Sequence, residues 1–275
     1  MLSIIRWPVL LFTALVQYVT AIYVFTPNKN HWEVLADYEL HFIVLSTAFM
    51  LAAGFIINSF YDFEKDLINR PDKTLFNRVV SKEFCLNTYL VFNGLGLIFS
   101  ALASWRVLLF FAAFAFWLWF YSHKLQKIPV VREVVAVVLS VVSVFSIALY
   151  YQYWHWIMPI FGAFFTCILF NREIIKDLKN HDGDMAVGNQ SISTKWGRRA
   201  AKAFFSTISF LAIMLLLSFY KVSEGKYALH FAVGISAIVV FSTILLLINK
   251  KPNTTHIAYK LILFMSVLYL ILGYR

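Results

Sequence analysis

Charged residues are scarce in this chain. Only 14% of its 275 residues are Asp, Glu, Lys or Arg, and 61% are hydrophobic, whereas a soluble domain has about 25% charged residues. A soluble fold of this size has too few polar side chains to cover so much apolar surface. The two cysteines, Cys85 and Cys167, have no metal-binding spacing and are too few for a disulfide scaffold. The composition is typical of a polytopic membrane protein.

Long apolar runs are the dominant pattern. A membrane-spanning helix needs about 20 mostly apolar residues. We therefore predict an all-α protein with nine transmembrane helices over residues 7–25, 40–60, 84–104, 107–122, 133–151, 155–173, 203–220, 228–248 and 257–273. The first run follows Arg6, as in a signal peptide. It is longer than a signal core and no small-residue cleavage site follows it, so we expect a retained helix.

The excess of basic residues predicts the orientation. A net charge of +10 would suggest nucleic-acid binding in a soluble protein, but cytoplasmic loops of membrane proteins also collect Lys and Arg. With the nine spans assigned, 19 of the 24 Lys and Arg lie on the side of the N-terminus and 5 on the other. We expect no nucleic-acid partner, an inner or plasma membrane location, a cytoplasmic N-terminus and an outside C-terminus. The loops 61–83 and 174–202 then face the cytoplasm.

Acidic residues concentrate in two segments. Eight of the 14 Asp and Glu lie in residues 58–73 and 172–184. At 100° per residue, the carboxylates and amides of each segment fall within an arc of about 60–80° around the helix axis, and so on one face of the helix. We name them the first acidic stripe (Asn58, Asp62, Asp66 and Asn69) and the second acidic stripe (Glu173, Asp177, Asn180 and Asp184). Like charges at this spacing repel, and all-oxygen ligands suit Mg²⁺, with Mn²⁺ able to substitute. We predict metal ligation by Asn58, Asp62, Asp66, Glu173, Asp177, Asn180 and Asp184.

The two stripes occupy matching positions. One ends the second span and the other ends the sixth, and Asp66 and Asp177 are 111 residues apart. Internal duplications with sites at the repeat interface are common in membrane proteins. We therefore expect one domain over 1–275, built as a pseudo-repeat of four-helix units over about 1–130 and 131–250 plus a ninth helix.

Basic residues are interleaved with the acids. Arg70, Lys73 and Arg78 follow the first stripe, and Arg172 and Lys176 accompany the second. Carboxylates with interleaved bases favour a metal–diphosphate site. An ion or metal transporter is the alternative from another class, but its ionisable groups usually lie near the bilayer midplane.

These residues resemble the UbiA superfamily of intramembrane prenyltransferases over the whole chain. The motifs that carry the resemblance are Asn58-x-x-x-Asp62-x-x-x-Asp66; Asn69-Arg70-Pro71-Asp72-Lys73, with Lys73 in place of an Arg; Asp184 followed by Gly188, Ser191 and Trp196-Gly197; Arg6-Trp-Pro; and Tyr121 with Lys124. The resemblance implies a helical bundle around a central cavity, in which two Mg²⁺ ions hold a prenyl diphosphate at the cytoplasmic end. The prenyl chain would run into the bilayer through a lateral opening.

The resemblance also implies residue roles. Asp62, Asp66, Asp177 and Asp184 would act in catalysis. The diphosphate would be bound by Arg6, Arg70, Lys73, Tyr121, Lys124, Arg172 and Lys176. Loss of diphosphate leaves an allylic cation that aromatic faces stabilise, and the candidates are Phe60, Tyr61, Tyr121 and Phe170. His181 and Glu64 are candidate bases toward the acceptor.

The acceptor is less well defined. The second motif, Arg172-Glu-Ile-Ile-Lys-Asp177 with Gly183-Asp184, is similar to that of the family branch that makes archaeal-type ether lipids, which implies a geranylgeranyl diphosphate donor and a prenylglyceryl phosphate acceptor. An aromatic quinone precursor is the alternative. The chain departs from the family at Asn180, where an Asp is usual, and at Arg132-Glu133, where Gly-Asn is usual. Either Asn180 or Asp177 could therefore be the second-site ligand.

Overall fold

The computed structural model describes residues 2–62, 81–186, 188, 190–223, 225, 227–248 and 252–273. Every regular element within these ranges is a helix. Nine of the helical segments that they contain are long and apolar enough to cross a membrane. The predicted all-α architecture with nine candidate spans is confirmed.

Two of the spans each combine a helix with a short turn of another helical type. The first joins α2 (Trp7–Thr20) to a π-helical turn η1 (Ala21–Phe25), and the fourth joins α8 (Trp105–His123) to a 3₁₀ turn η2 (Leu125–Lys127). The other spans are α4 (Tyr38–Tyr61), α7 (Lys82–Ala103), α9 (Val131–Tyr151), α10 (Ile157–Ala186), α11 (Ile192–Val222), α12 (Ala228–Ile248) and α13 (Asn253–Leu272). Two short helices, α1 (Leu2–Ile5) and α3 (His31–Leu35), lie near the N-terminus in sequence.

The segment 174–202 is mostly helical, and its prediction as a loop is wrong. Helix α10 continues to Ala186 and α11 already begins at Ile192. Helix α10 continues because apolar residues accompany the second acidic stripe along this segment, and Ile174, Ile175 and Leu178 among them are buried. The second acidic stripe therefore lies within a helix and not in a loop.

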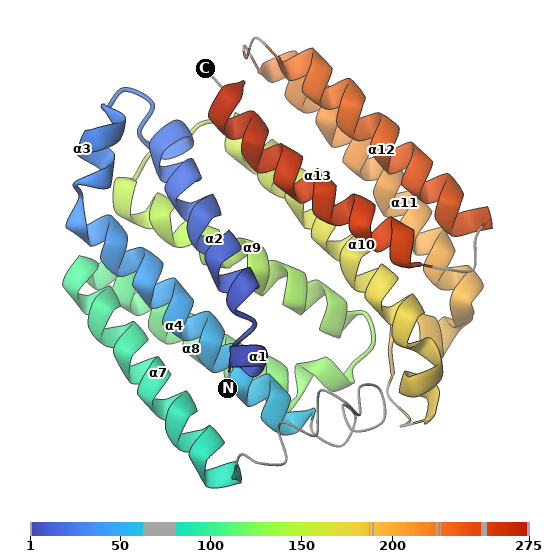
Figure 1. Ribbon diagram of the computed structural model, residues 1–275, viewed down its shortest axis with the longest axis horizontal. Coiled ribbons are helices and arrows are strands. Elements are labelled where there is room, and N and C mark those ends of the chain that lie inside the picture. Colours follow the sequence, from blue (N-terminus) through green and yellow to red (C-terminus); the bar gives the residue numbers. More distant parts are fainter. Residues whose placement is uncertain are drawn as a thin grey trace. The chain divides into compact units, whose positions relative to one another are not determined.

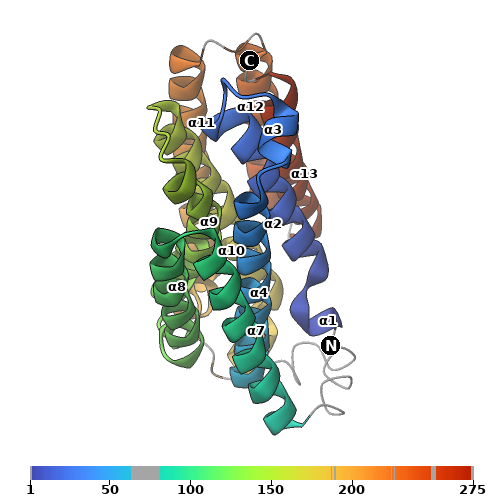
Figure 2. The same ribbon diagram turned by 90° about the vertical axis from the view of Figure 1, so that its left-hand side faces the viewer.

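The first of two compact units comprises residues 1–126 and 142–153. Within it, α4 packs against α2, α7 and α8, and Figure 2 shows α4 beside α7. The amide of Gln17 on α2 is fully buried and donates to Thr47 on α4 at 2.8 Å and to the backbone carbonyl of Ser143 on α9 at 3.1 Å. Such polar contacts hold helices together where lipid supplies no hydrophobic driving force.

The second unit comprises residues 127–141 and 154–275. In it, α10 and α12 each contact both α11 and α13, and the four helices lie side by side (Figure 1). Asn171 on α10 donates to Ser209 on α11 at 2.9 Å and to the Tyr259 hydroxyl on α13 at 3.0 Å. This buried network fixes the three helices against one another just before the second acidic stripe. The pseudo-repeat over 1–130 and 131–250 stays a prediction.

Candidate functional site

The first acidic stripe begins at the C-terminal end of α4. The Asn58 amide donates to Asp62 Oδ2 at 2.8 Å, and both residues are partly buried. Their spacing of four residues along a helix brings the two side chains together. The rest of the predicted set on this segment lies outside the described residues: Glu64, Asp66, Asn69, Arg70, Asp72, Lys73 and Arg78.

Aromatic side chains surround this end of α4. The Tyr61 hydroxyl is hydrogen-bonded to His123 Nδ1 at 3.1 Å, and the Trp119 ring stacks on His123 with centroids 5.4 Å apart. The Phe60 ring meets Tyr61 edge-on at 5.5 Å. Helix α8 therefore fixes the orientation of Tyr61, one of the predicted cation-stabilising aromatics.

The other predicted residues of this unit are placed as follows. Arg6 is exposed, and its guanidinium lies over the Phe55 ring at 5.0 Å from the centroid. Tyr121, near the end of α8, is partly buried, and Lys124, which follows α8, is exposed. Arg6 therefore packs against α4 close to the first stripe.

The second acidic stripe points into its unit. Asp177 and Asp184 are 3% and 1% exposed, whereas Asp182, on the opposite side of α10, is exposed and pairs with Arg198 at 2.7 Å. Glu173 and Asn180 are partly buried. The Lys176 ammonium, predicted to bind diphosphate, pairs with Glu173 at 2.9 Å. Phe170 and Arg172 lie seven and five residues before Asp177 on α10 and are partly buried.

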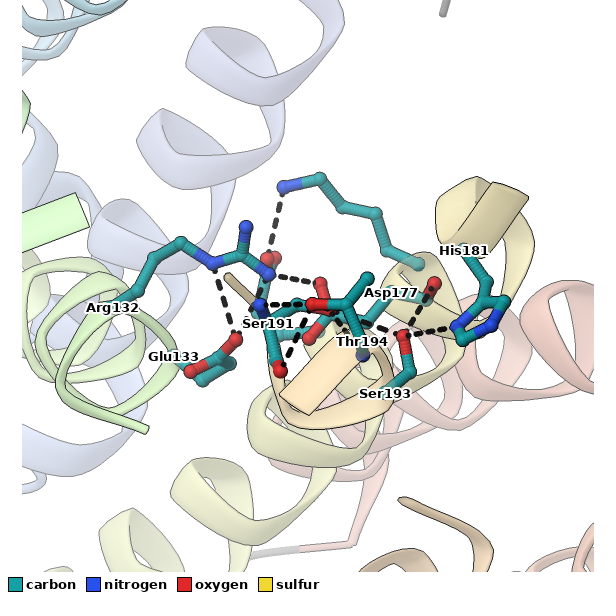
Figure 3. Close-up of polar contacts among 9 residues, drawn as sticks. Arg132, Glu133, Asp177, His181, Ser191, Ser193 and Thr194 are labelled. Carbon is teal, nitrogen blue, oxygen red and sulfur yellow. Dashed lines mark hydrogen bonds and ion pairs between the residues drawn. The ribbon is translucent and has the colours of Figure 1, made fainter. Parts of the chain in front are cut away.

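Asp177 has a basic partner that the sequence reasoning missed. Arg132, at the start of α9, donates through Nη2 both to Glu133 Oε1 and to Asp177 Oδ1 (Figure 3). Residues 132 and 177 are far apart in sequence, so helical spacing gave no reason to pair them. The one available signal was the departure from the family at Arg132-Glu133.

The first turn of α11 is hydrogen-bonded to the backbone of Asp177. Ser193 Oγ donates to the Asp177 carbonyl oxygen at 3.1 Å and is hydrogen-bonded to the His181 ring at 3.3 Å (Figure 3). Ser191 caps α11 by accepting from the Thr194 N–H at 3.2 Å. This capping box explains why α11 begins there. His181, a predicted base, thus takes part in a structural contact between α10 and α11.

The donor atoms match a hard divalent cation in kind. Asp62 and Asp184 offer carboxylates, and Asn58 and Asn180 offer amide oxygens, which are the ligands that Mg²⁺ prefers. Asp177 Oδ2 is buried and has no hydrogen-bond partner among the described residues. Among the residues that the structure describes, no three His, Cys, Asp or Glu side chains lie close enough together to bind one metal ion. The residues of each stripe therefore fit Mg²⁺ by donor chemistry.

Curated relatives share a name. Digeranylgeranylglyceryl phosphate synthase of Thermococcus gammatolerans is 28% identical over 223 residues, which cover 79% of this chain and 77% of the relative. The protein of the same name from Pyrococcus horikoshii is 24% identical over 250 residues, covering 86% and 84%.

Solved structures share the fold. A structure described as digeranylgeranylglyceryl phosphate synthase in membranes matches with a TM-score of 0.74 at 20% identity, covering 99% of this chain and 96% of the other. A UbiA homologue from Archaeoglobus fulgidus bound to GPP and Mg²⁺ matches with a TM-score of 0.76 at 17% identity, covering 98% and 97%. The UbiA prenyltransferase family matches residues 6–268. The chain belongs to the UbiA prenyltransferase family.

Proposed function

We propose that this protein transfers a prenyl group, best supplied as geranylgeranyl diphosphate, to a prenylglyceryl phosphate in ether-lipid synthesis. The observation that carries the proposal is the buried second acidic stripe, with Asp177 and Asp184 facing the interior of a helix bundle, in a chain of the UbiA prenyltransferase family. The shared name of the curated relatives supports the glyceryl phosphate acceptor. The GPP and Mg²⁺ bound to a homologue of the same fold support the donor class.

Each acidic stripe would hold metal through its own oxygen ligands. Asn58, Asp62 and Asp66 would contribute from the first stripe, and Asn180 and Asp184 from the second. Bound Mg²⁺ supplies Lewis-acid stabilisation of the charge that develops on the diphosphate leaving group. We further propose that Mn²⁺ substitutes, because both ions accept hard oxygen ligands.

The chain's own cations would bind the diphosphate. Arg172 lies on α10, Arg6 lies over the Phe55 ring of α4, and Lys124 follows α8, which packs against α4. Arg70 and Lys73 follow the first stripe in sequence. Guanidinium groups bind phosphate oxygens through two parallel hydrogen bonds, which hold the leaving group in place and stabilise its charge. Tyr121 would donate a hydrogen bond to the same group. Lys176 would act together with Glu173, with which it is paired.

The apolar surroundings would protect the reacting carbon. Phe60 and Tyr61 stand beside Asp62, and the Tyr61 hydroxyl is held by His123. Aromatic faces stabilise an allylic cation and exclude water that would otherwise capture it. We assign Phe60, Tyr61 and Phe170 to this role.

We also propose the orientation in the membrane. The distribution of Lys and Arg supports a cytoplasmic N-terminus and a cytoplasmic location of both acidic stripes. Labelling of single cysteines introduced near the two termini of a cysteine-free variant, with a reagent that does not cross the membrane, tests this arrangement. Labelling of the C-terminal site alone in intact cells is the expected result.

The proposed reaction is tested with purified protein, radiolabelled geranylgeranyl diphosphate and two acceptors, geranylgeranylglyceryl phosphate and 4-hydroxybenzoate. Label that moves into the organic phase only with the glyceryl phosphate supports the proposal. Label transferred to the aromatic acceptor instead would assign the protein to quinone-precursor prenylation.

A further inference from the structure

Arg132 occupies a buried position between two carboxylates. Its Nε and Nη2 donate to Glu133 Oε1 at 3.1 and 2.9 Å, and Nη2 also donates to Asp177 Oδ1 (Figure 3). Arg132, Glu133 and Asp177 are 9%, 1% and 3% exposed. A single guanidinium therefore joins the first turn of α9 to the second acidic stripe, away from solvent.

The charges explain why this arginine is needed. Two buried carboxylates without a cation would repel each other strongly, because water screens them poorly there. Arg132 supplies one positive charge to both. A divalent ion bound directly by Asp177 would have to lie close to the same guanidinium, and like charges at that distance repel strongly in a buried site. Arg132 and a metal ion therefore compete for Asp177.

Asp177 is also held through its backbone. Ser193 at the start of α11 donates to the Asp177 carbonyl oxygen at 3.1 Å. Residue 177 is thus the point at which α9, α10 and α11 are tied together. Asp184 lies seven residues further along α10, roughly 10.5 Å along the helix axis. Fixing residue 177 consequently fixes the direction of the helix that presents Asn180 and Asp184.

We propose that Arg132 is the internal cation of the second acidic stripe and pairs with Asp177 in place of a metal ion. Asp177 is then a positioning residue, and the stripe offers Asn180 and Asp184 to the metal. This inference rests on the proposed function, because it concerns the metal site of that reaction.

Metal binding by the full-length protein tests the assignment directly. Mn²⁺ binding in detergent, with inorganic pyrophosphate present, is followed by electron paramagnetic resonance for wild type, Asp177→Asn and Asp184→Asn. We expect Asp184→Asn, which removes a charged ligand, to raise the Kd for Mn²⁺ at least about tenfold. Asp177→Asn should change the Kd less than about threefold, because the Ser193 hydrogen bond to the backbone of residue 177 stays in place. A tenfold loss of Mn²⁺ affinity in Asp177→Asn would overturn this inference but not the proposed function. Absence of Mn²⁺ binding by wild type would overturn the proposed function with it.

Thermal unfolding of Arg132 variants tests the pairing. Arg132→Gln leaves two uncompensated carboxylates, so we expect its Tm to fall by about 5 °C or more and to recover in Arg132→Gln/Asp177→Asn. Arg132→Lys keeps the charge and should restore part of the Tm while leaving Mn²⁺ affinity at the wild-type value. If Arg132→Gln does not fold, Arg132→Lys and Asp177→Asn carry the comparison. Additive Tm losses in the double variant, or weaker Mn²⁺ binding in Arg132→Lys, would contradict the pairing.

Discussion

Two aspartates two residues apart on α10 provide a matched test of the site. Asp184 is 1% exposed and lies on the second acidic stripe. Asp182 lies about 160° away around the helix, and its side chain is 87% exposed and paired with Arg198. Asn replaces either carboxylate with a side chain of nearly the same shape, so both variants test charge without creating a cavity.

The expected losses in the rate of prenyl transfer differ between the two variants by more than an order of magnitude. Exposed ion pairs such as Asp182–Arg198 contribute about 0.2–1 kcal/mol to stability and are not placed to touch substrate, so Asp182→Asn should retain nearly full activity. Loss of one electrostatic stabiliser in a buried site costs about 2.7–4 kcal/mol of transition-state energy, or about 10²–10³-fold in rate. We expect a loss of that size in kcat for Asp184→Asn.

The assay is prenyl transfer by both purified variants at saturating Mg²⁺, together with their Tm values. A Tm close to wild type for Asp184→Asn would exclude misfolding as the cause of its slow rate. Equal rates for the two variants, or a slower Asp182→Asn, would refute the assignment of the stripe to the reaction.

Three further predictions concern the remaining stripe residues and the helix packing. Asp62→Ala should slow prenyl transfer at least about a hundredfold, whereas Asp72→Ala, off the first stripe, should cost far less; similar losses would count against the helical-face argument. Asn180→Asp adds a carboxylate beside Asp184. It should leave the rate of prenyl transfer nearly unchanged or lower the Mg²⁺ concentration needed for half-maximal activity. A large loss of rate would contradict this prediction. Tyr259→Phe removes the hydrogen bonds to Asn171 and Ser209 and should lower the free energy of unfolding by about 1 kcal/mol. Denaturant titration in detergent micelles measures this change. An unchanged free energy of unfolding would mean that the network does not hold the helices together.

The sequence predicted the spans well because twenty-residue apolar runs have few alternatives in a bilayer. It misplaced the end of α10, since the charges at Arg172, Glu173 and Asp177 look like the start of a loop in a hydropathy reading. In the structure these charges alternate with buried apolar residues such as Ile174 and Ile175, so the helix continues to Ala186.

The candidate site was predictable where it depends on local spacing. Asn58 and Asp62 meet as their four-residue separation requires, and the burial of Asp184 against the exposure of Asp182 follows from the helical period. The pairing of Arg132 with Asp177 was not predictable, because it joins two helices and depends on tertiary packing.

The central claim is that this member of the UbiA family catalyses metal-dependent prenyl transfer. The most direct measurement is product formation from geranylgeranyl diphosphate and geranylgeranylglyceryl phosphate by the protein in liposomes, after exhaustive EDTA treatment and after Mg²⁺ is restored. We predict no lipid product in EDTA and a product heavier by one geranylgeranyl group, identified by mass spectrometry, once Mg²⁺ is added. Full turnover in EDTA, or no product with Mg²⁺ from a protein that keeps its native Tm, would contradict the account.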